Sequence, residues 1–269
     1  MSITLRAAAV AAMFYPGSAV VLARDIAQML AKAPRSFTQR PKAIIVPHAG
    51  YVYSGPVAAS VYGPLAALRG TIRRVVLLGP THRVAIAGLA LPSSTGFETP
   101  LGIVPIDVQA RSCIEGLPQV VVSDAAHAQE HSLEVQLPFL QTVLGEFSLL
   151  PLAVSDASPQ AVAEVLERLW GGDETLIVVS SDLSHYLPYG AAQHIDAQSA
   201  QRIIDLDPTL DHEQACGAAP VNGLLLAAHN HGLRAQLLDL RNSGDTAGDK
   251  ARVVGYAAFT FYEPEDHAY

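Results

Sequence analysis

Cysteine is scarce in this sequence, and this scarcity limits the kind of fold that we expect. The 269 residues include two cysteines, Cys113 and Cys216. Two are too few for a disulfide framework, so a reducing cytoplasm is the expected location. In that setting a cysteine among polar groups is of interest as a thiolate. Cys113 has no such setting, and we expect it to serve packing.

Basic residues are also few. The chain has 17 Lys and Arg against 25 Asp and Glu, a formal net charge of −8, and no run of Lys or Arg. This balance offers nothing that would attract a phosphate backbone or an anionic bilayer. No apolar run reaches the roughly 18 residues of a membrane helix, and the N-terminus lacks the basic segment of a secretory signal. We therefore expect a cytoplasmic protein without nucleic-acid or membrane partners.

Three common enzyme signatures are missing. There is no Gly-x-Ser-x-Gly elbow of a hydrolase, no dinucleotide-binding fingerprint and no P-loop. The glycine-rich segment 242–249 lacks the glycine–lysine core of a phosphate loop, so we interpret it as a flexible turn. Any chemistry must come from another set of residues.

The apolar residues, half of the sequence, are arranged as alternating strands and helices. Continuous apolar runs bounded by turns are typical of strands buried in a parallel sheet. With no internal repeat or linker, this pattern favours one α/β domain over residues 1–269, with helices on both faces of a mostly parallel or mixed sheet. The expected strands are 42–47, 73–82, 147–154, 175–180, 233–240 and 253–261, with shorter ones at 85–91, 102–106 and 120–122. The expected helices are 18–32, 56–68, 133–144, 158–170, 190–214 and 220–231.

Titratable side chains follow three of these strands. His48 follows the first, His82 the second, and Asp182 with His185 the strand 175–180. Because parallel strands place their carboxyl ends at one edge of a sheet, we expect these residues to share a cleft. A single histidine beside a turn is more often structural, so their convergence carries this interpretation.

Two imidazoles and one anionic ligand resemble the arrangement of non-haem iron oxygenases. The anion here is Asp182 or a Cys216 thiolate, and a thiolate favours iron, copper or zinc over magnesium or calcium. Cys216 precedes an expected helix start, which favours a thiolate. The alternative is that it is a small buried core residue.

Other polar and aromatic residues lie near these candidates in the sequence. His127 and His131 are four residues apart and would share a helix face, either as ligands or as a cap and hydrogen-bonding partners around the ligands. Glu130 is a further candidate for such a supporting role. Tyr51 and Tyr53 follow His48 and either line the cleft or pack.

Several motifs together resemble one protein family. They are Ala-Ala-Val-Ala-Ala-Met-Phe-Tyr-Pro at 8–16, Pro-His-Ala-Gly-Tyr at 47–51, Gly-Pro-Thr-His at 79–82, Glu-His-Ser-Leu-Glu at 130–134, Ser-Ser-Asp-Leu-Ser-His-Tyr at 180–186, Cys-Gly at 216–217 and Val-Gly-Tyr at 254–256. In this order, over nearly the whole chain, they resemble the Memo family, whose prokaryotic members are named AmmeMemoRadiSam system protein B.

This resemblance implies a fold and a site. The Memo family is similar to class III extradiol dioxygenases, which are α/β/α sandwiches. Carried over to this sequence, the resemblance implies His48, His82 and Cys216 as metal ligands, with Asp182 and His185 beside them. We expect these two residues to be catalytic, with His185 moving protons and Asp182 or a neighbour orienting it. His131, Glu130, Tyr51 and Tyr53 would support the ligands. Cys216 stands where the dioxygenases have a glutamate, and this difference puts ring cleavage itself in doubt.

The resemblance also implies two functions of different classes. The first is an oxidoreductase that depends on iron or copper, with zinc as a further candidate metal that would favour hydrolysis. The second is a non-catalytic adaptor that binds a peptide or protein. The expected ligand in the cleft is a small molecule or a peptide, and the prokaryotic family name implies AMMECR1-like and radical-SAM partners. Family membership does not identify the substrate.

Overall fold

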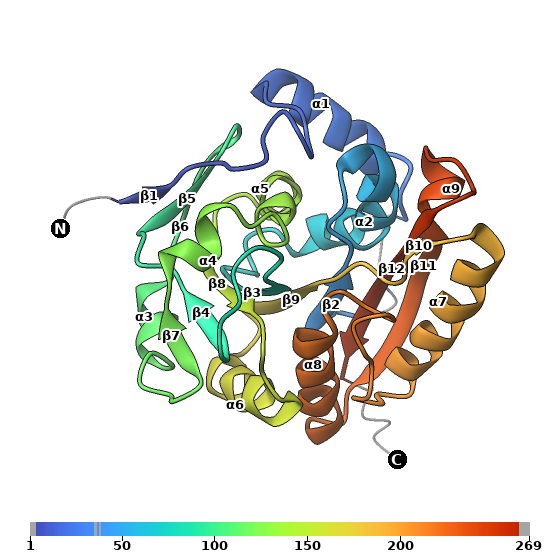
Figure 1. Cartoon of the computed structure of the whole chain (residues 1–269). Helices are drawn as coiled ribbons and strands as arrows, with labels where there is room; N and C mark the ends of the chain where they lie inside the picture. Colours follow the sequence, from blue (N-terminus) through green and yellow to red (C-terminus); the bar gives the residue numbers. More distant parts are fainter. Residues whose placement is uncertain (1–3, 35–36, 38, 264–269) are drawn as a thin grey trace, which may run out of the picture.

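The computed structural model describes residues 4–34, 37 and 39–263. A nine-stranded mixed sheet has the order β10-β12-β2-β9-β3-β8-β4-β7, and β11 pairs with β12 (Figure 1). Its strands are β2 (Ala43–Val46), β3 (Arg74–Pro80), β4 (Leu89–Leu91), β7 (Val120–Val122), β8 (Ser148–Val154), β9 (Thr175–Ser180), β10 (His185–Leu187), β11 (Arg234–Asn242) and β12 (Val253–Tyr262). The β2, β9, β3 and β8 strands are parallel neighbours, as their continuous apolar runs predicted.

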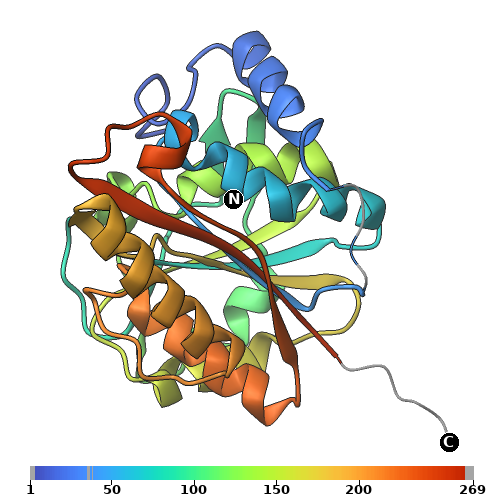
Figure 2. The ribbon, with the colours of Figure 1, turned by 90° about the vertical axis from the view of Figure 1, so that its right-hand side faces the viewer.

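Helices cover both faces of this sheet (Figure 2). The helices are α1 (Ala19–Leu30), α2 (Tyr51–Leu65), α3 (Val108–Ser112), α4 (Asp124–Ala128), α5 (Leu137–Leu144), α6 (Pro159–Leu169), α7 (Tyr189–Ile204), α8 (Ala218–Asn230) and α9 (Ser243–Thr246). The α1, α2 and α5 helices pack on one face, and α6, α7 and α8 pack on the other. The predicted α/β/α sandwich is therefore confirmed.

Strand alternation divides the interior into two cores. In β2, Ile44 and Val46 point to the core under α1, α2 and α5, while Ala43 and Ile45 point to the other core. All four are at most 1% exposed. Successive side chains of a strand point to opposite faces, so a strand buried on both faces is apolar at every position.

The start of α2 was predicted wrongly. The helix begins at Tyr51, directly after the His48 turn, and Pro56 lies inside it rather than at its first position. Proline removes one helical hydrogen bond, but the helix already exists at this point because Ser54 donates its backbone N–H to the Gly50 carbonyl, 3.1 Å away. Buried packing against the core compensates for the lost bond.

The segment 85–106 also differs from the prediction. The two short strands expected at 85–91 and 102–106 belong to different sheets: β4 joins the main sheet, whereas β5 (Gly96–Thr99) pairs with β6 (Gly102–Pro105) in a separate sheet with β1 (Leu5–Arg6). Pairing with the N-terminal strand is a long-range contact that a local pattern does not reveal. Two smaller expectations were wrong as well: segment 243–246 is a capped helix rather than a flexible turn, and Cys113 is exposed.

None of the described helices combines the length and the apolar composition that crossing a membrane requires.

Candidate metal centre

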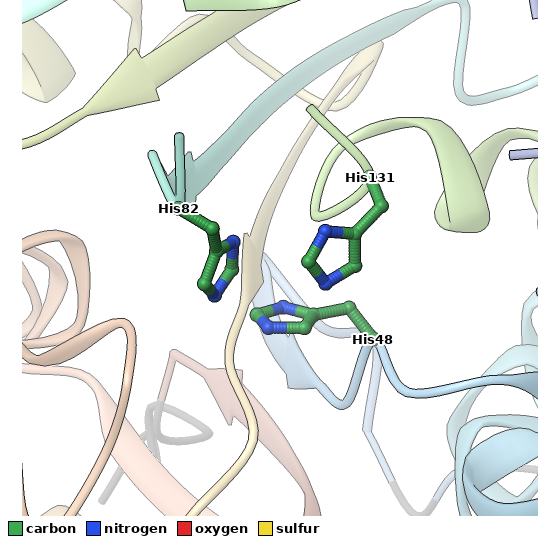
Figure 3. A group of neighbouring side chains, drawn as sticks. All are labelled: His48, His82 and His131. Carbon is green, nitrogen blue, oxygen red and sulfur yellow. The ribbon is translucent and has the colours of Figure 1, made fainter. Parts of the chain in front are cut away.

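Three histidines meet at the edge where the parallel strands end. His48 follows β2, His82 follows β3, and His131 lies in the loop between α4 and the short 3-10 helix Glu134–Gln136. One nitrogen from each ring lies within 4.8 Å of the corresponding nitrogens of the others, and the rings face one another (Figure 3). His48 is 1% exposed, while His131 is partly buried and His82 is exposed to the cleft.

The hydrogen bonds around Ser180 define the tautomer of His48. The Ser180 hydroxyl donates its proton to the Ser132 carbonyl, 2.6 Å away, and accepts from the Gln136 side chain at 2.8 Å. It is therefore an acceptor for His48 Nδ1, at 3.0 Å. With Nδ1 protonated, the lone pair of the His48 ring lies on Nε2, where it is available to a metal.

Glu130 supports the other two histidines. Its Oε1 lies 2.8 Å from His82 Nδ1 and 3.2 Å from His131 Nδ1, and its carboxylate also accepts from the backbone N–H groups of His82, His131 and Ser132. Burial alone would raise the pKa of Glu130, but the hydrogen bonds from His82 and Ser132 outweigh it and lower the pKa to about 2. A carboxylate that orients an imidazole in this way is typical of metal sites.

The protein keeps two of these imidazoles neutral. Burial, followed by the neighbouring histidines, holds the pKa of His48 well below its ordinary value. Burial likewise lowers the pKa of His131 to about 4, with His82 as the next cause. Neutral imidazole is the form that binds a metal, so these two rings need not lose a proton at pH 7 in order to bind one.

Cys216 lies next to the histidine group, just before α8. Its Sγ is 3.2 Å from His48 Nε2, but among the described residues the group of mutually close donors comprises the three histidines. Burial raises the pKa of the Cys216 thiol, and the nearby Asp182 raises it further. The protein's own groups thus favour the thiol, and thiolate ligation requires the charge of a bound cation. The role of Cys216 as a metal ligand stays a prediction.

Asp182 and His185 also reach the cleft. Asp182 accepts the backbone N–H of His48 at 2.7 Å, and burial raises its pKa to about 7 in spite of such hydrogen bonds. His185 Nδ1 donates to the Leu183 carbonyl at 2.8 Å, which leaves Nε2 as an acceptor. The Leu183 carbonyl, rather than Asp182, orients His185. Catalytic roles for both residues stay predictions.

One cleft of about 1230 Å³ contains the candidate ligands and their neighbours. Its lining brings together His48, His82, His131, Asp182, His185 and Cys216. Its lining also includes residues that the sequence did not indicate as site residues, among them Phe14, His212 and Glu213. Phe14 lies in a quoted family motif, and its ring centroid is 4.6 Å from that of His131. His212 and Glu213 lie in a loop, because α7 ends at Ile204 and not at residue 214 as expected.

Tyr51 and Tyr53 occupy a different position. Tyr51 is buried and donates its hydroxyl to the Val135 carbonyl at 2.6 Å, while Tyr53 is 40% exposed. Both line a neighbouring pocket of about 480 Å³ and are not among the described residues that line the cleft. Tyr51 supports the segment after His131 by packing and hydrogen bonding.

His127 does not share a helix face with His131, contrary to the expectation. The α4 helix ends at Ala128, so His131 lies beyond it. His127 is 1% exposed, and its Nε2 donates to the Ala90 carbonyl at 2.9 Å. Burial lowers its pKa to about 4. His127 therefore serves as a structural contact between α4 and β4.

Replacing His127 with glutamine should flatten the pH dependence of stability. Folding lowers the pKa of His127 from the ordinary 6.5 to about 4. Its neutral form therefore contributes stability that is fully present above pH 6.5 and is lost as the pH falls towards 4. At pH 4.5 the wild type should lose roughly 2 to 3 kcal/mol through this residue. Urea unfolding at pH 7 and pH 4.5 measures the difference. If the free energy of unfolding of the wild type and of His127→Gln changed equally between pH 7 and pH 4.5, the result would contradict a lowered pKa of His127.

Comparison with known proteins identifies the family. The sequence profile described as Memo-like protein matches residues 6–260. The chain belongs to the Memo family. A MEMO1 family protein from Ignicoccus hospitalis is 38% identical, over 97% of this chain and 99% of its own length. One from Aquifex aeolicus is 36% identical, over 96% and 99%. These relatives match the Memo-family chain over almost its whole length.

A solved structure shares the fold of this Memo-family protein. The uncharacterized protein JW3007 from Escherichia coli K12 superposes with a TM-score of 0.56, covering 80% of this chain and 98% of that one. The sequence identity is 14%, so the similarity concerns the fold alone.

Proposed function

We propose that this Memo-family protein is an oxidoreductase that depends on iron or copper. The convergence of the His48, His82 and His131 nitrogens within 4.8 Å at a cleft carries the proposal. His48 and His82 are the ligands that the sequence also predicts, His131 is the third donor, and Cys216 adjoins His48 as a fourth.

The donor set fits a first-row transition metal. Imidazole suits iron, copper and zinc, whereas magnesium and calcium prefer oxygen ligands. One ring fixed in its tautomer by Ser180 and two rings supported by Glu130 match what such a metal requires. A bound iron or copper ion would supply electron exchange at coordination positions that the protein leaves open.

The remaining residues of the cleft handle protons and exclude water. His185 lines the cleft, and its Nε2 can accept a proton from a bound substrate because its Nδ1 donates to the Leu183 carbonyl. Asp182, with a pKa of about 7, can hold or release a proton near neutral pH. Apolar lining residues such as Phe14 and Val154 keep water away from the reacting groups.

Oxygen consumption tests this function. Protein loaded with Fe(II) or Cu(II) should consume oxygen with at least one member of a panel of catechols, thiols and other reductants, faster than the free ion does. His185→Ala should slow this reaction while metal content stays unchanged. His194→Ala, on the exposed side of α7, is the matched control. Rates equal to those of the free ion across the panel would refute the proposal.

A peptide-binding adaptor is the second candidate. Small-molecule pockets usually measure about 300 to 1,000 Å³, and this cleft measures about 1230 Å³, which favours a larger ligand. The partners proposed on the family resemblance are AMMECR1-like and radical-SAM proteins. Co-purification of such a partner with metal-loaded protein that is inactive across the panel would support this function over the first.

A further inference from the structure

The cleft that contains the three histidines also carries two exposed acidic residues. Asp156 follows β8 and Glu213 lies shortly before α8, and both are exposed residues that line the cleft. Within the described part of the chain, neither forms an ion pair. Their carboxylates are thus available to a ligand.

Lysine and arginine do not occur among the described residues that line the cleft. Arg83 is adjacent in sequence to His82, and Arg252 lies over the Tyr186 ring, with its guanidinium carbon 5.1 Å from the ring centroid. Neither arginine is a lining residue. The described lining therefore offers a ligand carboxylates but no lysine or arginine, and the positive charge of the cleft would be that of a metal ion bound by the histidines.

The lining of the cleft combines polar groups of different exposure with apolar surface. His48 is 1% exposed, whereas Asp156 and Glu213 are exposed. The lining also includes the apolar residues Phe14, Leu187, Ile195 and Val254. A ligand with an apolar body and a positive end would pack the body against these apolar residues and leave the positive end near the exposed carboxylates.

We propose that the cleft selects ligands that carry a protonated amine on an apolar body, and that Asp156 and Glu213 determine this preference. The inference extends the proposed oxidoreductase function by naming its substrate class. It concerns binding, however, and requires no turnover. Exposed carboxylates act through a screened Coulomb interaction, so each contributes modestly and the preference weakens with added salt.

Binding of two isosteric probes tests the proposal on the full-length protein with its metal content measured. Phenethylamine and 2-phenylethanol share a body and differ in charge. Ligand-detected NMR at 50 mM salt should show the amine binding about fivefold or more tightly than the alcohol, since each screened charge pair contributes modestly. In 0.5 M salt the ratio should approach one.

Two matched double variants separate the effect of the carboxylates in the cleft from the effect of the net charge of the protein. Asp156→Asn with Glu213→Gln should reduce the amine-to-alcohol ratio to about one. Glu115→Gln with Glu164→Gln, which removes the same charge from exposed positions outside the cleft, should leave the ratio unchanged. An equal affinity for both probes in the wild type, or a ratio that survives the first double variant, would overturn the proposal, as would tighter binding of phenylacetate. An amine preference without oxygen consumption would leave this inference intact while refuting the oxidoreductase function.

Discussion

Replacing Glu134 with alanine is expected to lower the free energy of unfolding by roughly 3 to 5 kcal/mol, the cost of breaking a buried ion pair. The Glu134 carboxylate is completely buried. It pairs with the buried Arg6 guanidinium and accepts the backbone N–H groups of Ala9 and Val10 and the Tyr15 hydroxyl. Removing it leaves the buried Arg6 cation without a counter-charge and leaves the donors from Ala9, Val10 and Tyr15 without an acceptor. Urea unfolding at pH 7 measures the change.

A surface variant provides the control for this experiment. Glu115→Ala removes an exposed i,i+4 partner of Arg111, and such pairs contribute about 0 to 1 kcal/mol. Arg6 also donates to the carbonyls of His127 and Glu130, so the N-terminal segment holds the loop that carries His131. If Glu134→Ala lowered the free energy of unfolding by no more than Glu115→Ala does, the hydrogen-bond network around Glu134 would not stabilise the fold.

Replacing Glu130 with glutamine should weaken metal binding about 10- to 100-fold, the usual effect of losing a carboxylate that orients ligating histidines. The carboxylate holds His82 and His131 through their Nδ1 atoms and carries a full charge at neutral pH because its pKa is lowered to about 2. The neutral amide supplies neither that charge nor two strong acceptors. Competition with a metal-binding dye gives the affinity.

The control for Glu130 is Glu146→Gln, an exposed position after α5, which should retain the wild-type affinity. Thermal unfolding of the metal-free proteins separates misfolding from loss of ligand orientation. Wild-type metal affinity in a folded Glu130→Gln protein would contradict the supporting role of this carboxylate.

Much of the fold and part of the site could be predicted from local pattern. The β2, β9 and β3 strands are neighbours in that order, so His48, Asp182 and His82, which follow them, lie near one another for the reason that the sequence suggested. The apolar runs identified these strands because burial on both faces excludes polar residues. His48 and His82 were therefore accessible to sequence reasoning.

The place of His131 could not be predicted in this way. No strand delivers it, and its ring is positioned by Glu130 and by the Ser132–Ser180 hydrogen bond across 48 residues of sequence. The spacing from His127 suggested a shared helix, but α4 ends before His131. Likewise, helix-start reasoning suggested a thiolate at Cys216, whereas burial raises its pKa, because tertiary packing outweighs the local dipole.

The identity of the third donor is a separate question that two variants address. His131→Ala and Cys216→Ser each remove one candidate beside His48 and His82. The proximity of the three imidazoles predicts that His131→Ala loses more affinity than Cys216→Ser. X-ray absorption of the loaded wild type would show a sulfur ligand if Cys216 also binds.

Metal stoichiometry and affinity test the central claim most directly. The wild type should bind one equivalent of Fe(II) or Cu(II), and His48→Ala and His82→Ala should each lose at least about 100-fold in affinity, while His194→Ala should match the wild type. Mass spectrometry of the dialysed proteins and dye competition supply both values. Unchanged metal content and affinity in His48→Ala and His82→Ala would contradict the account.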